Sequence, residues 1–194
     1  MVIGPVRTRN CVILDTFLPV FLVVGLVTEH IDLAERLGEE LRDREETIAV
    51  AESCTGGLVG GAITAVPGSS DYFDQGFVTY ANDAKQVALG VSREALDQHG
   101  AVSAPVAREM AQRARDVAGT TWAIATTGVA GPTGGTEQTP VGTVYIAIAH
   151  AAPWGSESSS VSAERHEFDG DRAAVREQTV DRALLVVLEA MDAV

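Results

Sequence analysis

The amino-acid sequence predicts an α/β fold: a single three-layer α/β/α sandwich around a mixed central sheet of about five or six strands. Short apolar segments that suit buried strands are interspersed with segments of helical periodicity. Glycines and small polar residues follow several of the apolar segments, as is typical of strand-to-helix turns. With 194 residues, the chain is long enough for one domain with a sizeable core and too short for two ordinary ones.

The first 30 residues are expected to form an apolar N-terminal extension, and residues 31–194 the folded domain. Residues 11–27 are strongly apolar but contain Asp15 and Pro19, and these 17 residues fall short of a full span, which takes roughly 20. Three interpretations stay open: a start site assigned too far upstream, an extension that packs on the domain or a partner, and a weak membrane anchor. Because nothing later in the chain indicates export, we expect no stable membrane association.

Helices are predicted from apolar spacing and from capping residues. Ile31, Leu37 and Leu41 follow helical spacing with charges between them, and Ser92 and Ser103 are residue types that cap helix starts. The expected helices are 31–44, 56–65, a short one capped by Asn82 that carries Lys85, one opened by Ser92, 103–118, and one that Asp169 and Asp171 open and that ends at Met191.

Apolar segments at 47–51, 77–80, 122–127, 142–149 and 161–168 are predicted strands, the last an edge strand because polar and apolar residues alternate in it. Three loops follow such strands. Ligands gather at strand ends in open α/β sheets, so we expect these loops to converge on one pocket. The loops are Glu52–Gly57, Tyr80–Lys85 and Thr127–Gly135.

The composition limits the classes of partner. The formal net charge is −13, and 13 of the 14 basic residues are arginine, leaving Lys85 as the only lysine. Such acidity argues against nucleic-acid binding through a broad basic patch, although one anion can still bind in a local pocket. It also suggests a protein of high-salt surroundings, where surface repulsion is screened. Cys11 and Cys54 form neither a disulfide framework nor a zinc site, so we expect a reducing cytoplasm and no metal or cofactor.

The turn after the first strand places Ser53 beside Cys54. Either residue is a candidate nucleophile, and Ser53 is equally explained as a helix cap. A serine hydroxyl needs a base, and Lys85 is the available one if burial lowers its pKa; otherwise it is an ordinary exposed helix residue. Tyr80 precedes that lysine by five residues and could relay a proton or hold the amine.

Further along the chain, a glycine-rich loop and an arginine are candidate anion-binding groups. Thr127 and the glycines could donate hydrogen bonds to an anion or oxyanion, although an ordinary tight loop has the same composition. Arg172 could hold a phosphate or carboxylate, or pair with the neighbouring aspartates. The glycines concerned are Gly128, Gly131, Gly134 and Gly135.

Several blocks together resemble the C-terminal domain of the competence-damage-inducible protein CinA, over roughly residues 31–193. The blocks are Ala51-Glu52-Ser53-Cys54-Thr55-Gly56-Gly57, Gly76-Phe77-Val78-Thr79-Tyr80-Ala81-Asn82, Lys85, His99-Gly100-Ala101-Val102-Ser103, Gly128-Val129-Ala130-Gly131-Pro132 with Gly134-Gly135, Pro140-Val141-Gly142-Thr143-Val144 and Gly170-Asp171-Arg172. The apolar tail matches nothing in the family pattern.

Stand-alone members of that family are nicotinamide-nucleotide amidases of the PncC type. The resemblance implies hydrolysis of the carboxamide of nicotinamide mononucleotide to nicotinate mononucleotide and ammonia, in pyridine-nucleotide salvage, commonly by a homodimer. Carried over by position, Ser53 resembles the nucleophile, Lys85 its base and Tyr80 their partner, while Thr127 and Arg172 resemble the active-site residues of the later blocks.

The chemistry of the residues agrees with this implication. Ser53 would attack the amide carbon while main-chain N–H groups around Thr55 and Gly56 stabilise the oxyanion. Lys85 or Tyr80 would protonate the departing ammonia. A second interpretation, of a different class, is a non-catalytic nucleotide-binding or regulatory domain linked to competence or DNA damage. Ligand affinity without turnover would favour it.

Overall fold

A five-stranded mixed sheet forms the middle layer of the domain, which confirms the predicted fold class. The computed structural model describes residues 20–194 except 154 and 157, without the side chains of 20–29. The strands lie in the order β2-β1-β3-β4-β5, with β1, β2 and β3 parallel and β4 and β5 antiparallel to their neighbours. Their bounds are β1 Ile48–Glu52, β2 Phe73–Val78, β3 Trp122–Gly128, β4 Thr143–His150 and β5 Ser160–Glu167.

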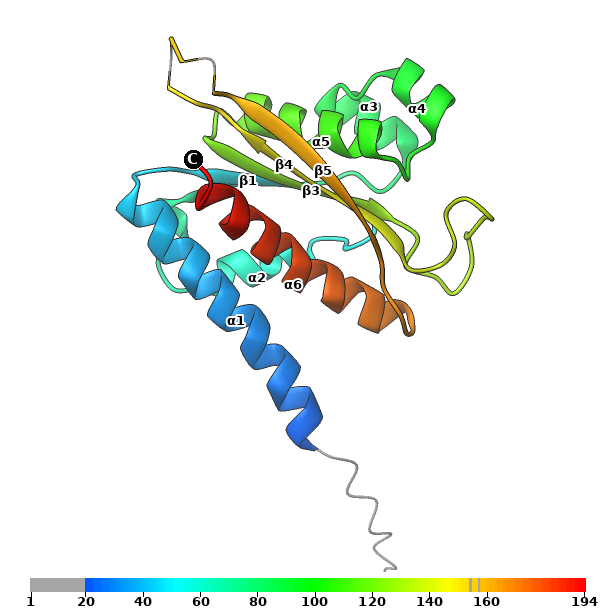
Figure 1. The fold of residues 1–194 in the computed structure, drawn as a ribbon, viewed down its shortest axis with the longest axis horizontal. Helices are drawn as coiled ribbons and strands as arrows, with labels where there is room; N and C mark the ends of the chain where they lie inside the picture. Colours follow the sequence, from blue (N-terminus) through cyan, green and yellow to red (C-terminus); the bar gives the residue numbers. More distant parts are fainter. Residues whose placement is uncertain (1–19, 154, 157) are drawn as a thin grey trace, which may run out of the picture.

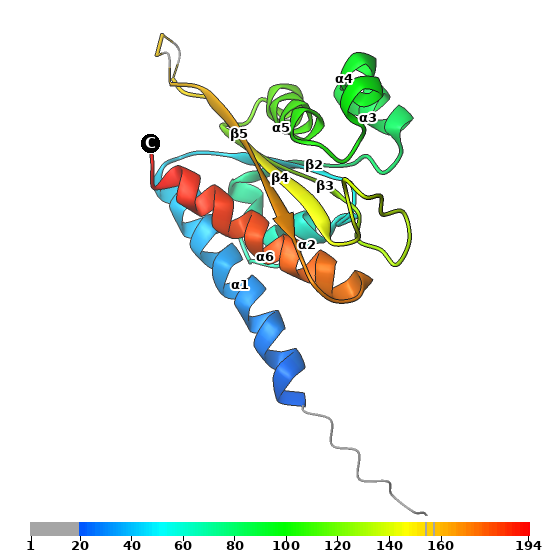
Figure 2. The ribbon, with the colours of Figure 1, turned by 45° about the vertical axis from the view of Figure 1, so that its right-hand side comes forward.

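Helices cover both faces of the sheet (Figure 1). Helices α1, α2 and α6 pack on one face, and α3, α4 and α5 lie on the other, as the turned view also shows (Figure 2). The bounds are α1 Val20–Asp43, α2 Leu58–Thr64, α3 Asn82–Leu89, α4 Arg93–His99, α5 Ala104–Ala118 and α6 Arg172–Met191, with a short 3₁₀ turn at Ser69–Asp71.

The two faces of the sheet carry side chains of different size. Toward α1, α2 and α6 the central strands present bulky residues such as Ile48, Trp122 and Ile146. Toward α5 the alternate positions are alanines, for example Ala49 and Ala125. Small side chains on that face let the amphipathic α5 approach the sheet closely, since its buried face is also rich in alanine. The sheet therefore separates two apolar cores, one built from bulky side chains and one rich in alanine.

Helix α1 begins earlier than the sequence predicts. It is continuous from Val20, so it crosses the expected boundary between residues 30 and 31, and its first turns project beyond the rest of the domain (Figures 1 and 2). Part of the apolar segment thus continues the helix. The remainder of the predicted extension, residues 1–19, lies outside the described residues. Within the described part of the chain, no helix combines the length and apolar character needed to cross a membrane.

Two other boundaries differ from the prediction. Strand β2 was expected at 77–80 but begins at Phe73, because its pairing with β1 tolerates polar residues on an exposed edge strand. Asn82 does not cap α3: the carbonyl of Ala81 accepts the first helical hydrogen bond, from the N–H of Lys85 at 3.1 Å, so Asn82 is already inside the helix. The caps predicted at Ser92, Ser103 and Asp171 are confirmed.

Candidate active site

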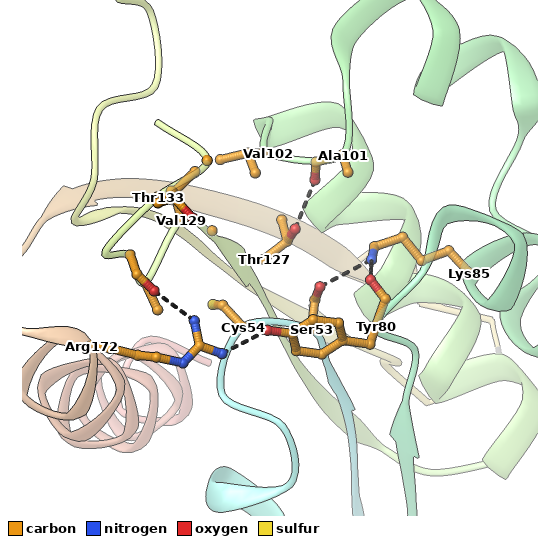
Figure 3. A pocket seen from close by; sticks show the side chains of 14 residues that line it. Ser53, Cys54, Tyr80, Lys85, Ala101, Val102, Thr127, Val129, Thr133 and Arg172 are labelled. Carbon is orange, nitrogen blue, oxygen red and sulfur yellow. Dashed lines mark hydrogen bonds between the residues drawn. The ribbon is translucent and has the colours of Figure 1, made fainter. Parts of the chain in front are cut away.

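The three loops that follow β1, β2 and β3 line one pocket of about 280 Å³, which confirms the expected convergence. This is the edge of the sheet where three parallel strands end together. The loop before α5 completes the wall through Ala101 and Val102. Figure 3 shows the side chains that point into this space, with Ser53 and Lys85 facing one another.

Lys85 reaches the nucleophile candidate across the pocket floor. Its Nζ lies 3.1 Å from Ser53 Oγ, and it donates to the carbonyls of Thr79 at 2.8 Å and Tyr80 at 3.4 Å. The side chain is only 1 % exposed and has no carboxylate within 4 Å among the described residues. Burial in this setting lowers the pKa of the Lys85 amine. The residue is therefore no ordinary exposed lysine.

Three oxygen atoms surround the amine of Lys85: Ser53 Oγ and the carbonyls of Thr79 and Tyr80. An ammonium has three hydrogens and can donate to all of them. A neutral Nζ has two hydrogens for the two carbonyls and one lone pair left for the hydroxyl of Ser53. In that state the serine donates and the amine accepts. The same pair of atoms can thus pass a proton in either direction.

The backbone holds Ser53 rigidly between two strands. Its N–H donates to the carbonyl of Thr126 at 2.9 Å, and the carbonyl of the preceding Glu52 accepts from Thr79 at 2.8 Å. Gly56 and Gly57 follow with φ of 61° and 96°, a left-handed conformation that glycine adopts without strain. This pair is why α2 begins at Leu58 rather than at Gly56 as predicted.

Glu52 occupies the N-terminus of α2, a role that the sequence analysis missed. Its buried carboxylate accepts from the N–H groups of Gly57, Val59 and Gly60 at 2.9, 3.2 and 2.8 Å. The free N–H groups at the start of α2 are therefore already bonded to the Glu52 carboxylate, and they are not available to bind an anion in the pocket. The only signal in the sequence was an acidic residue at the end of an apolar strand.

We expect Glu52→Gln to lower the free energy of unfolding by about 2–4 kcal/mol, because an amide NH₂ would face N–H donors where a carboxylate oxygen now accepts. Denaturant unfolding measures this change. Glu39→Gln, on the exposed face of α1, is the matched control and removes the same charge. Equal stability of the two variants would contradict the capping role.

Thr55 and Gly56, predicted as oxyanion donors, do not line the pocket. The Thr55 hydroxyl is buried against that of Thr126 at 2.7 Å, and the N–H of Gly56 is bonded to the carbonyl of Ser53 at 3.2 Å. The pocket instead includes Cys54, which directly follows the serine. Burial raises the pKa of the Cys54 thiol to about 12, which disfavours the reactive thiolate.

Tyr80 and Arg172 meet across the mouth of the pocket. The Arg172 guanidinium donates to the Tyr80 phenol oxygen at 2.7 Å and to the carbonyl of Gly131 at 2.8 Å (Figure 3). The phenol therefore contacts the arginine, and Tyr80 reaches Lys85 only through its main-chain carbonyl. Arg172 is not ion-paired with the neighbouring aspartates, one of the two interpretations left open, since Asp171 caps α6 instead.

The remaining predicted residues lie on the opposite wall. Thr127 donates to the carbonyl of Ala101 at 2.7 Å and so ties β3 to the loop before α5. Of the four candidate glycines, Gly128, Gly131 and Gly134 line the pocket, and Gly135 does not. A Cβ at Gly128 would lie 2.6 Å from the carbonyl oxygen of Thr143, so this glycine is needed for the close approach to β4. The lining residues to which the sequence analysis gave no role are Ala101, Val102, Val129, Ala130 and Thr133.

Comparison with known proteins places these features in a family. The model of the CinA C-terminal domain matches residues 30–191. Nicotinamide-nucleotide amidohydrolase PncC of Escherichia coli is 47 % identical over 157 residues, which is 81 % of this chain and 92 % of that protein. A CinA-like protein of Chloroherpeton thalassium is 49 % identical over 166 residues, 86 % of this chain. This chain covers only 39 % of that longer relative.

Solved structures agree with the sequence matches. The competence/damage inducible protein CihA of Agrobacterium tumefaciens superposes with a TM-score of 0.78 at 38 % identity, over 84 % of this chain and 96 % of that one. A CinA superfamily protein of Klebsiella pneumoniae gives 0.79 at 34 % identity, over 85 % and 99 %. With a family model that covers most of its length, this chain belongs to the CinA C-terminal domain family.

Proposed function

We propose that this protein hydrolyses the carboxamide of nicotinamide mononucleotide to nicotinate mononucleotide and ammonia, in pyridine-nucleotide salvage. The observation that carries the proposal is the buried hydrogen bond of 3.1 Å between Lys85 Nζ and Ser53 Oγ. It supplies an activated hydroxyl without histidine, the arrangement of Ser–Lys hydrolases. Relatives named for this amidohydrolase activity match most of the chain.

In the first half of the proposed reaction, neutral Lys85 takes the hydroxyl proton as Ser53 Oγ attacks the amide carbon. The new oxyanion is stabilised by main-chain N–H groups, for which Cys54, directly after the nucleophile, and the pocket-lining Gly131 are the candidates. When the C–N bond breaks, the Lys85 ammonium returns its proton to the nitrogen that leaves as ammonia. Ser53 is then an ester of the nicotinate group.

In the second half, water replaces ammonia. Lys85, neutral again, takes a proton from water as its oxygen attacks the ester carbon, and the bond to Ser53 Oγ breaks. The serine recovers a proton from Lys85, and the carboxylate product leaves. Ser53 and Lys85 are the only protein groups that change protonation state, because the oxyanion donors only form hydrogen bonds. The second proton of the water leaves with the nicotinic acid and passes to solvent when the acid ionises. Tyr80 and Arg172, held together at the mouth, are proposed to orient the substrate.

A direct assay tests the proposal. Purified protein is incubated with nicotinamide mononucleotide, and ammonia and nicotinate mononucleotide are measured in parallel. Equimolar formation of both products is expected. Tight binding of the nucleotide with no product, over a range of salt concentrations, would contradict the amidase and favour the non-catalytic nucleotide-binding domain.

We propose in addition that the protein works as a homodimer in the cytoplasm, without a nucleic-acid partner, and that it is adapted to high salt. The family resemblance supports the dimer, and the presence of only two cysteines supports a reducing cytoplasm. The charge of −13 with one lysine supports adaptation to high salt and argues against a nucleic-acid partner. Sedimentation equilibrium over a range of KCl concentrations tests the assembly. A monomer mass at every concentration would contradict the dimer.

A further inference from the structure

A second pocket, of about 640 Å³, adjoins the candidate active site and shares Ala130 and Arg172 with it. One side is the glycine-rich loop and the other is the start of α6, through Asp171 and Arg176. Because the two pockets share two lining residues, they are adjacent, and an extended ligand with its reacting group at Ser53 would have its far end near the second one. The proposed function leaves this space without a role.

Two guanidinium groups line this second pocket. Arg172 and Arg176 are four residues apart in α6 and so lie on one face of the helix. Neither has a carboxylate within 4 Å among the described residues, whereas other arginines of the chain, such as Arg115 and Arg182, form ion pairs. In a protein with 27 acidic residues, two adjacent unpaired cations at one pocket indicate an anionic ligand.

Arg176 is also incompletely hydrogen-bonded. Its Nη2 donates to the carbonyl of Thr55 at 2.7 Å, while its Nε is buried and has no partner among the described residues. A guanidinium carries five N–H donors in a planar fork. Among the described residues, Arg176 makes one hydrogen bond, which holds the turn that follows Ser53. Because Nε is buried, the donors of this pocket-lining side chain that can serve a ligand are those of its Nη atoms.

Asp171 limits which groups can bind the anion. Its carboxylate lines the same pocket and accepts from the N–H groups of Ala173 and Ala174, both at 3.0 Å. The first free main-chain donors of α6 are therefore already used, and a negative charge stands beside them. An anion in this pocket must be held by the arginine side chains, on the side away from Asp171.

We propose that Arg176, together with Arg172, forms the subsite for the phosphate monoester of the substrate. The proposal rests on the proposed function, because it assumes that the carboxamide occupies the Ser53 pocket. A mononucleotide has its amide at one end and its phosphate at the other, which matches two adjoining pockets with a shared wall. Arginine binds phosphate oxygens in pairs, with a planar geometry that lysine lacks. Arg176 thus favours nicotinamide mononucleotide over nicotinamide riboside, which lacks the phosphate.

The kinetic test compares two substrates. In Arg176→Met, the ratio of kcat/KM for nicotinamide mononucleotide to kcat/KM for nicotinamide riboside is expected to fall about a hundredfold, the size of a lost charged hydrogen bond. Arg176→Lys should lower the ratio less, since charge remains without the fork. Arg113→Met, on the exposed face of α5, removes the same charge and should leave the ratio unchanged. An unchanged ratio in Arg176→Met, with both substrates equally slowed, would mean that Arg176 only supports the Thr55 turn.

A binding measurement separates this proposal from the amidase itself. Calorimetric titration with ribose 5-phosphate and with ribose needs no turnover. The wild-type protein should bind ribose 5-phosphate and not ribose, and Arg176→Met should bind the phosphate at least about tenfold more weakly. Equal affinity in the variant, or no binding by the wild-type protein, would overturn the subsite even if the amidase is active. Phosphate binding without amide hydrolysis would uphold the subsite and reject the reaction.

Discussion

Replacing Ser53 by alanine is expected to reduce ammonia release from nicotinamide mononucleotide by at least about 10⁴-fold, because removal of a serine nucleophile leaves only binding and oxyanion stabilisation. The fold should be unaffected, since the Ser53 contacts to β3 and to Gly56 are made by its backbone. Single-turnover measurement of product, with unfolding curves alongside, gives both quantities.

Cys54→Ala is the matched control for this prediction. The thiol neighbours Ser53 and lines the same pocket, but its raised pKa of about 12 keeps it protonated at neutral pH. The variant should retain most of the activity, because the main-chain N–H of residue 54 is preserved. An inactive Cys54→Ala beside an active Ser53→Ala would assign the nucleophile to the thiol.

Replacing Lys85 by methionine is expected to lower kcat by about 10³-fold, within the usual contribution of a positioned general base. Methionine has a similar length and suits a site that is 1 % exposed, so the loss should be chemical rather than a collapse of the pocket. Steady-state kinetics measures it. A variant with near wild-type kcat would show that another group activates Ser53.

The pH dependence checks the same residue independently. Lys85 must be neutral to accept the serine proton, so kcat should rise with pH and then reach a plateau. The midpoint of the rise should lie below 10.5, the ordinary lysine pKa, because burial lowers the pKa of this amine. In the interval between the lowered value and 10.5 the unfolded chain holds more protons than the folded one. Stability should therefore also rise with pH through that interval, and Lys85→Met should remove this rise.

The sequence predicted the two central residues of the candidate site, Ser53 and Lys85, better than the residues that surround them. The apolar strand that ends at Ser53 and the single lysine pointed to the two residues that the structure brings within 3.1 Å. The strand end is a local pattern and the single lysine is a feature of the composition, so both can be recognised without knowing how the chain packs. The convergence of three loops followed from the parallel strands, since parallel neighbours end at one edge of a sheet.

The parts that were missed depend on tertiary contacts. Glu52 gave no sign in the sequence that its carboxylate turns back to cap α2. The main-chain N–H groups of Thr55 and Gly56 were expected to stabilise an oxyanion, but neither residue lines the pocket, and the N–H of Gly56 is bonded to the carbonyl of Ser53. The role of Arg176 depends on how α6 docks against the Ser53 turn, 121 residues away in the chain. The start of β2 was missed because the polar residues that follow Phe73, such as Gln75, pair with β1 through the backbone while their side chains are exposed.

Burial of the only lysine has a consequence for labelling chemistry. Acylating reagents that modify side-chain amines find no target on the outside of the folded domain, because the only lysine of the chain is buried. Modification at position 85 would then require either a reagent small enough to enter the pocket or an opening of the domain. The rate at which a bulky ester acylates Lys85, measured separately from acylation of the α-amino group, thus reports the opening of the domain without an engineered probe.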